Sequence, residues 1–189
     1  MASIYRYVRS YSDVGDVLVC AAKNSTVEEF NRTLSAANWD HAQQLGLYAK
    51  VFPGDPIICT KNHYNEGLVN GMLGVVKSIG DEILVAWEGE PVDPDTGRSM
   101  PKIVPQKAAI DIRLAYAITC HKSQGSAAPT VIVALEDTTL ITREWLYTAV
   151  TRARYQVILV GRQKELRKAA ARRTLRTTGF NPFSKEMHT

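Results

Sequence analysis

Hydrophobic positions near the start of the chain predict a strand followed by a helix. Residues 16–22 (DVLVCAA) are almost wholly apolar, a pattern typical of a parallel strand covered on both faces. The apolar positions that follow recur at helical spacing: Val27, Phe30, Leu34 and Ala37. Ser25, with Glu28 three residues later, predicts a capping box that satisfies free N–H groups of the first helical turn. This strand-loop-helix unit is the expected opening of an α/β domain.

The pattern changes between residues 53 and 111. Short runs rich in β-branched residues alternate with turn-forming sequences such as NEG, NGM and GDE, and helical spacing is absent. Asp81 and Glu82 follow an apolar run, as an acidic pair does in a nucleotide-hydrolysing strand. Because Gly80 precedes them and β-runs flank them, a hairpin turn is favoured. We expect a small antiparallel β-barrel or sheet inserted into the α/β domain.

After Ile112 the α/β pattern returns. Strands are expected in the runs IRLAYAIT, TVIVAL and YQVILVG, and a helix in TREWLYTAVTRAR, with Thr142 as its N-cap. The basic segment RQKELRKAAARRTLRT has helical propensity. The expected organisation is two parts of one α/β domain, an insert between them and a C-terminal tail: residues 1–52 and 112–178, residues 53–111, and residues 179–189.

Charge and cysteine content narrow the classes of function. The chain has 189 residues, a net charge of +4 and a pI of about 9.0, and basic residues crowd into its last quarter, as in many nucleic-acid binding proteins. Its three cysteines are far apart, which suggests neither a zinc site nor a disulfide framework. No apolar run approaches the roughly 20 residues of a membrane helix, so we expect a cytoplasmic protein without a membrane partner.

The densest group of reactive side chains lies at the predicted carboxyl end of a strand, where ligands bind in open parallel sheets. Residues 118–125 (ITCHKSQG) hold several hydrogen-bonding side chains before a glycine: Thr119, His121, Lys122, Gln124 and then Gly125. Ser123 lacks the flanking glycines of a hydrolase nucleophile, and adjacent Cys120 and His121 lack the spacing of a structural zinc site. A ligand-binding loop and a merely solvated loop both stay open on these residues alone.

Two arginines in the sequence YTAVTRAR form a second candidate group. Arg152 and Arg154 are two residues apart and would point in roughly opposite directions on a helix, so both can hardly address one phosphate. If one contacts a phosphate, we expect the other to hold an ion pair or a second ligand. The alternative is that both are solvated helix arginines.

The order of these sequences resembles superfamily 1 DNA helicases of the RecD-like branch. LAYAITCHKSQGS, an apolar strand, LYTAVTRAR and VILVG look like helicase motifs V and VI, and VLVCAAKNSTVEEFNRTL is similar to the motif IV region. GDPIICTKNHYNEGLVNGMLGVV resembles the start of the SH3-like barrel inserted in the second motor domain. The implied fold is α/β: a RecA-like parallel sheet of the P-loop NTPase type, without its own phosphate loop, carrying an inserted small SH3-like β-barrel.

The resemblance implies DNA contacts for matching residues. Thr119 and His121, with Lys122 beside them, would face the backbone of single-stranded DNA, where neutral donors hold phosphates without reading bases. Lys61 and His63 are candidate DNA contacts of the inserted barrel, and a structural role is their alternative.

The resemblance also implies nucleotide contacts. Gln124 and Gly125 would couple the DNA contact to the nucleotide. Arg152 would be the catalytic arginine finger, because a permanently charged planar fork suits the charge that develops on the γ-phosphate. Ala127 stands where many relatives carry a Glu that contacts the ribose, so the resemblance does not extend to that contact.

The sequence contains no GxxxxGK[ST] phosphate loop. That loop, its Lys and the acidic pair that holds Mg²⁺ would lie in a preceding motor domain. ATP and Mg²⁺ are therefore expected only with this upstream RecA-like domain, which is also the expected protein partner. The leading hypothesis is the C-terminal motor domain of an ATP-dependent, 5′-to-3′ DNA helicase that is inactive as this chain alone. The alternative is a non-catalytic nucleic-acid or protein-interaction module derived from a helicase.

Overall fold

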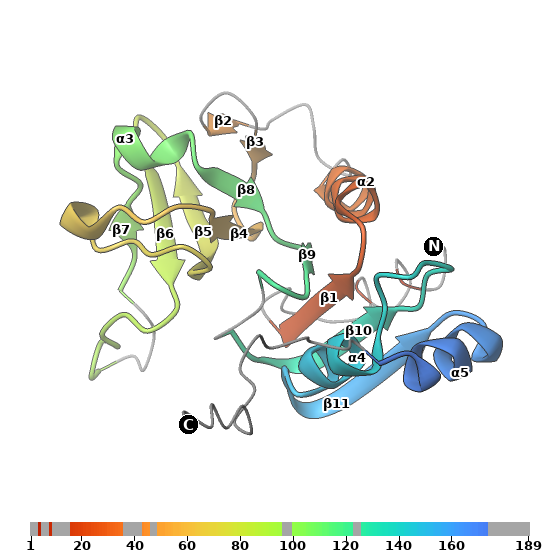
Figure 1. Cartoon of the computed structure of the whole chain (residues 1–189). Coiled ribbons are helices and arrows are strands. Elements are labelled where there is room, and N and C mark those ends of the chain that lie inside the picture. Colours follow the sequence, from red (N-terminus) through yellow and green to blue (C-terminus); the bar gives the residue numbers. More distant parts are fainter. Residues whose placement is uncertain are drawn as a thin grey trace, which may run out of the picture.

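The computed structural model describes residues 4, 8, 16–35, 43–45, 49–95, 100–122 and 126–173 (Figure 1). The candidate residues Gln124 and Gly125 lie outside this part of the chain, as does the expected tail. The described residues form a parallel sheet with helices and, beside it, an antiparallel sheet. None of their helices is long and apolar enough to cross a membrane.

The parallel sheet has four strands. Their order is β11 (Ala153–Val160), β10 (Ala128–Ala134), β1 (Val17–Ala21) and β9 (Ala117–Thr119), and every neighbouring pair is parallel. All five residues of β1 are buried, because this strand has a partner on each edge and side chains packed on each face. This explains the unbroken apolar run that predicted the strand.

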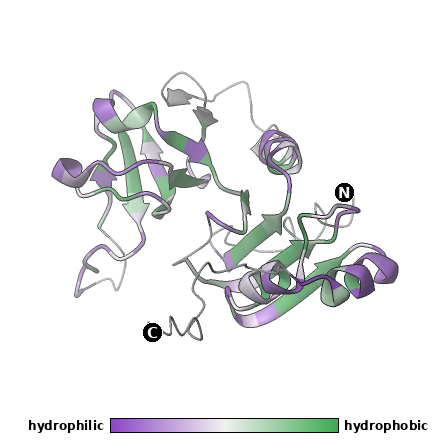
Figure 2. Cartoon of the chain, in the orientation of Figure 1, coloured by the Kyte–Doolittle hydropathy of each residue, from purple (hydrophilic) through white to green (hydrophobic). Residues whose placement is uncertain are grey.

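Helices cover both faces of the parallel sheet. On one face, α2 (Asn24–Ser35) packs Phe30 and Leu34 into the cluster that contains Val19 of β1. On the other, Trp145 of α4 (Arg143–Val150) packs into the cluster that contains Leu18, and α5 (Gln163–Ala171) adds to it through Ala169. Successive residues of β1 thus serve opposite faces, as the pleat of a strand requires. Figure 2 shows hydrophobic residues along β1 and β10 and mainly hydrophilic ones on α5.

The N-terminus of α2 differs from the predicted capping box. The helix begins at Asn24, so Ser25 lies inside its first turn and the prediction of Ser25 as N-cap is wrong. Instead, Glu136, just beyond β10, accepts hydrogen bonds from the backbone N–H groups of Ala22 (2.7 Å) and Lys23 (3.2 Å) and from Oγ1 of Thr26 (2.6 Å). A carboxylate that follows the neighbouring strand therefore binds the two residues that lead into the helix and a side chain of its first turn.

The N-terminus of α4 follows its prediction. Thr142 is the N-cap, and its side chain accepts a hydrogen bond from the backbone N–H of Trp145. The helix ends at Val150, earlier than the pattern predicted, so Arg152 lies beyond it and Arg154 belongs to β11. The prediction that both arginines lie on one helix is wrong.

The antiparallel sheet has five strands. Their order is β7 (Lys102–Ile103), β6 (Ile83–Trp87), β5 (Leu73–Ile79), β4 (Pro56–Cys59) and β8 (Ile112–Leu114). The inward positions Ile83, Val85 and Trp87 alternate along β6, and they share a core with Ile57 and Ile112. Asp81 and Glu82 lie in the β5–β6 turn, where the N–H of Gly80 donates to the carbonyl of Glu82, as predicted.

Smaller elements flank this sheet. A hairpin of β2 (Gln43–Leu45) and β3 (Ala49–Val51) precedes it, a 3-10 turn η3 (Tyr64–Glu66) follows β4, and a short helix α3 (Gln106–Ala109) precedes β8. The side chain of Val51 is buried in the core of the antiparallel sheet.

The run IRLAYAIT belongs to two sheets rather than one strand. Its first residues form β8, antiparallel to β4, and its last form β9, parallel to β1. Ala115 and Tyr116 carry the chain across, and the N–H of Ala115 donates to the carbonyl of Pro56 at 2.8 Å. The expectation of a single strand is therefore wrong, because continuous hydrophobicity does not reveal where a chain changes sheets.

Candidate nucleic-acid and nucleotide interface

The segment Thr119–Lys122 leaves the carboxyl end of β9. Thr119 pairs with Ala21 at the edge of the parallel sheet, and its carbonyl accepts a hydrogen bond from the N–H of Lys122 at 2.9 Å. Cys120 is buried, with its Sγ 3.5 Å from the carbonyl of Trp145, whereas His121 and Lys122 are exposed. The thiol therefore anchors the segment, and the two basic side chains face solvent.

A turn of the antiparallel sheet lies against this segment. Gly71, between β4 and β5, has a φ of +90°, and a Cβ atom added there would lie 3.6 Å from the carbonyl oxygen of Lys122. The hydroxyl of Ser126 points to the carbonyl of Gly71 at 3.4 Å. Lys122 and Ser126 thus both lie next to Gly71 of this turn.

Arg152 reaches the same loop from its other end. Its Nε donates to the carbonyl of Thr148 at 3.2 Å, and its Nη1 lies 3.4 Å from the carbonyl of Ser126. Its own carbonyl accepts a hydrogen bond of 3.0 Å from the N–H of Ala128. The two groups of residues singled out in the sequence therefore meet at Ser126, which is buried.

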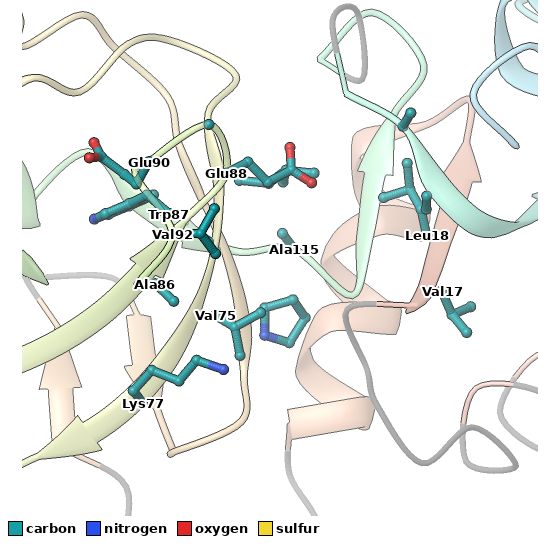
Figure 3. A pocket seen from close by; sticks show the side chains of 16 residues that line it. Val17, Leu18, Val75, Lys77, Ala86, Trp87, Glu88, Glu90, Val92 and Ala115 are labelled. Atoms are coloured by element: carbon teal, nitrogen blue, oxygen red, sulfur yellow. The ribbon is translucent and has the colours of Figure 1, made fainter. Parts of the chain in front are cut away.

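A cavity of about 320 Å³ lies between the sheets, at the first residues of β1 and β10 (Figure 3). In this view Val75 and Glu88 of the antiparallel sheet face Val17 and Leu18 of β1. Its charged lining residues, Lys77, Glu88 and Glu90, all come from the antiparallel sheet, and Ala127 lines it as well. Ala127 itself has no carboxylate, but it lines the same cavity as the carboxylates of Glu88 and Glu90.

The charge of Arg154 acts on a carboxylate that lines this cavity. Burial raises the pKa of Glu88, and the positive charge of Arg154 lowers it. Arg154 therefore acts on a carboxylate of the antiparallel sheet, while Arg152 contacts the loop that ends at Ser126. The two arginines therefore have different surroundings, because Arg152 follows α4 and Arg154 belongs to β11 rather than because they point apart on one helix.

Lys61 and His63 share one partner. Nζ of Lys61 is 3.0 Å from one carboxylate oxygen of Asp111, and Nε2 of His63 is 3.1 Å from the other. The hydrogen bond from Lys61, the largest cause, and that from His63 hold the pKa of Asp111 below its ordinary value. The side chain of Lys61 is 71% exposed and that of His63 is 18% exposed, so the structural role fits His63 better than Lys61.

Other functional polar residues escaped the sequence analysis. Tyr116 Oη donates to a carboxylate oxygen of Asp55 at 2.5 Å, and both residues are buried where the chain crosses between the sheets. Asn31 of α2 binds the backbone at the same crossing. No local signal identified these residues, because each is far in sequence from its partner. Among the described residues, no group of three or more His, Cys, Asp or Glu side chains could hold a metal ion.

The fold is similar to that of Pif1 helicase structures. The structure of the Pif1 helicase from Bacteroides in complex with ADP-AlF3 and single-stranded DNA matches with a TM-score of 0.56, at 18% identity, over 86% of this chain and 46% of that one. At this identity the likeness concerns the fold, which is therefore a RecA-like α/β domain.

The sequence relationship is more specific. Residues 114–160 match the UvrD-like helicase C-terminal domain. The RecBCD enzyme subunit RecD of Mycobacterium tuberculosis is 36% identical over 171 residues, which cover 86% of this chain and 28% of that protein. The ATP-dependent RecD2 DNA helicase of Deinococcus radiodurans is 36% identical over 123 residues, which cover 64% of this chain and 16% of that protein. The chain is thus a relative of the RecD-like helicases that spans about a quarter or less of their length, and the predicted resemblance is confirmed.

Proposed function

We propose that this chain is the C-terminal motor region of a RecD-like helicase, which moves 5′ to 3′ and couples single-stranded DNA to ATP hydrolysis. The observation that carries the proposal is the contact between Arg152 and Ser126, because it joins the proposed arginine finger to the loop that starts at Thr119. A change at the DNA end of this loop can therefore reach the arginine through the backbone between residues 119 and 126.

On the DNA side, Thr119, His121 and Lys122 bind the backbone of single-stranded DNA. The exposure of His121 and Lys122, with Cys120 buried between Thr119 and His121, supports this role. Such contacts hold phosphates in register without selecting a sequence. Lys61 adds a cation from the antiparallel sheet, which we take to be an SH3-like barrel inserted in the motor domain.

On the nucleotide side, Arg152 stabilises charge on the γ-phosphate of ATP, and Gln124 and Gly125 couple the DNA contact to the nucleotide. Mg²⁺ and the phosphate loop come from the upstream RecA-like domain. The bonds of Arg152 to Thr148 and Ser126 support this role, because they orient the guanidinium before the nucleotide arrives. The chain alone neither binds ATP tightly nor hydrolyses it.

The proposed role of Arg152 can be tested by measuring ATPase kinetics in a longer protein. In this chain joined to its upstream motor domain, Arg152→Ala should lower DNA-stimulated ATP turnover by about 10³-fold or more, because an arginine finger contributes on that scale. Arg152→Lys should be similarly impaired, since an ammonium lacks the planar fork. Affinity for single-stranded DNA, measured by fluorescence anisotropy, should stay near that of the wild type. Normal turnover in Arg152→Ala would show that the assignment is wrong.

A binding titration of the chain alone tests the DNA side. Its affinity for a labelled single strand should fall steeply as salt rises, and Lys122→Ala should reduce that dependence because one phosphate contact is lost. Leu140→Ala, at an exposed apolar position, is the control. A wild-type chain that binds no single-stranded DNA would contradict the proposed contacts and leave a protein-interaction module as the better account.

A further inference from the structure

The main chain crosses between the two sheets twice, and α2 lies at both crossings. The outward crossing enters the antiparallel sheet at β4, directly after Asp55, and the return crossing lies between β8 and β9 and includes Tyr116. Figure 1 shows α2 above the end of β1, on the side toward β9 and the return crossing. Two polar side chains of this helix, Asn31 and Ser35, make hydrogen bonds there.

Asn31 makes three hydrogen bonds to the return crossing. Its Nδ2 donates to the carbonyls of Leu114 and Ala117, each at 3.0 Å, and its Oδ1 accepts from the N–H of Ala117 at 2.8 Å. Leu114 is the last residue of β8 and Ala117 the first of β9. One side-chain amide therefore uses two donors and an acceptor to hold the ends of strands that belong to different sheets.

A second tie joins the two crossings to each other. Asp55 accepts hydrogen bonds from Oη of Tyr116 at 2.5 Å and from the N–H of Phe52 at 2.9 Å, and the hydroxyl of Ser35 lies at 3.4 Å. Asp55 and Ser35 are buried, and so is most of Tyr116. The crossings are thus pinned by polar contacts that water cannot easily replace.

Among the described strands, the strand that follows has a ladder partner on one edge only, while its residues Ala117 and Ile118 are buried in the cores on its two faces. β9 is three residues long and is the last strand in the order of the parallel sheet, where it pairs with β1. Thr119 is its final residue, and His121 and Lys122 follow within the next turn. A short edge strand contributes few ladder hydrogen bonds, so its position depends on contacts at its start.

We propose that Asn31 is a positioning residue for the segment Thr119–Lys122: by binding both ends of the return crossing it fixes β9, and thereby the place at which that segment meets single-stranded DNA. The effect on DNA rests on the function proposed above, whereas the effect on the backbone does not. Asn31 touches no ligand in this role and acts only through the main chain of Leu114 and Ala117.

The variant Asn31→Asp isolates the donors. A carboxylate keeps the acceptor for the N–H of Ala117 but loses both donated bonds and places negative charge beside two carbonyl groups. Thr33→Ala is the matched control, because among the described residues the hydroxyl of Thr33 bonds only to the carbonyl of Glu29 in its own helix, on the exposed side of α2.

Amide hydrogen exchange is the first measurement. In Asn31→Asp, residues 114–122 should exchange about tenfold faster than in the wild type, since two buried donors are lost there, while the core strands of both sheets keep their protection. In Thr33→Ala this segment should not change. Equal exchange of residues 114–122 in Asn31→Asp and Thr33→Ala would overturn the proposal.

The affinity for single-stranded DNA is the second measurement. Asn31→Asp should weaken the affinity of the chain for a labelled single strand by about fivefold or more. In the chain joined to its upstream motor domain, the DNA concentration for half-maximal ATPase should rise similarly, with the maximal rate unchanged. Faster exchange with unaltered DNA affinity would overturn the positioning role. A wild-type chain that binds no DNA would contradict the proposed function, whereas faster exchange in that same chain would still support the backbone role of Asn31.

If Asn31→Asp does not fold, Tyr116→Phe provides a second test of the proposal. It removes one hydroxyl, and with it the bond to Asp55, while the ring still fills its place. It should raise exchange in residues 114–122 and weaken DNA binding in the same direction. Unchanged exchange in a folded Tyr116→Phe chain, together with an unfolded Asn31→Asp chain, would assign Asn31 to folding alone and overturn the proposal.

Discussion

At the scale of single residues, the buried carboxyl of Asp55 makes the crossing between the sheets sensitive to pH. Burial, the largest cause, raises the pKa of Asp55 above its ordinary value of 3.8, while hydrogen bonds from Tyr116, Phe52 and Ser35 lower it. The raised value means that the folded chain holds this proton more tightly than the unfolded chain. The resulting stability is fully present below pH 3.8 and is lost as pH rises through the folded-state pKa.

Replacing Tyr116 should make the free energy of unfolding depend more strongly on pH. In Tyr116→Phe the carboxylate loses the hydroxyl that lowers its pKa, so that pKa should rise further and more stability should be lost on ionisation. The loss of unfolding free energy relative to the wild type should be small at about pH 3 and grow by roughly 1.5–3 kcal/mol at about pH 7, the range for a hydrogen bond to a charged group. Urea unfolding at both pH values measures it. Tyr147→Phe, at an exposed tyrosine, is the control, and a loss independent of pH would contradict the account.

Some candidate site residues stand in recognisable sequence patterns, whereas other polar residues at the crossings have no such pattern around them. Thr119, His121 and Arg152 stand in sequences whose residue types and order point to a function, and the structure connects their loop to the arginine through Ser126. Asp55 and Asn31 carry no such signal. Their partners lie 61 and 86 residues away, so only the folded chain shows that they meet.

At the scale of elements, local patterns predicted most strands but not every boundary. The alternation along β6 and the apolar run of β1 reflect burial on one face and on two, and both are visible in the sequence. The helix end at Asn24 and the division of IRLAYAIT between β8 and β9 are not visible, because they are decided by Glu136 and by pairing with β4 and β1.

The two possible caps of α2 can be compared directly. Glu136→Ala should lower the free energy of unfolding by roughly 1–3 kcal/mol, because two backbone N–H groups and a hydroxyl lose their acceptor. Glu28→Ala, at the position of the predicted capping box, should change it by less than about 0.5 kcal/mol, since Glu28 is an exposed residue within the helix. Denaturant unfolding of both variants gives the comparison. Equal losses would mean that the local capping box stabilises the helix after all.

At the scale of the whole molecule, the order of sequence motifs predicted a parallel sheet with inserted β-structure, but not how the two parts join. The parts are joined by the hydrogen bond between Asp55 and Tyr116 at the two crossings, and the charge of Arg154 of β11 acts on Glu88, which follows β6. The hydrophobic core is shared as well. Ile58 of β4 is buried in the same cluster as Leu18 and Val131 of the parallel sheet. The antiparallel sheet therefore shares a core with the parallel sheet and is not an independent module that is joined to it only by two linkers.

This shared core predicts one cooperative unfolding transition. Trp87 lies in the core of the antiparallel sheet and Trp145 beside the parallel sheet, and both are buried, so their fluorescence reports on the two parts separately. In a Trp39→Phe background, each chain that keeps only one of these tryptophans should give the same midpoint by tryptophan fluorescence as by far-UV circular dichroism, which reports on both sheets. Ile58→Ala should shift both transitions together by roughly 2–5 kcal/mol, as expected for a large buried side chain, whereas Ile103→Ala at an exposed position should shift neither. Two separate midpoints would show that the sheets are energetically independent, and the crossing at Asn31 would then transmit far less between them than its hydrogen bonds imply.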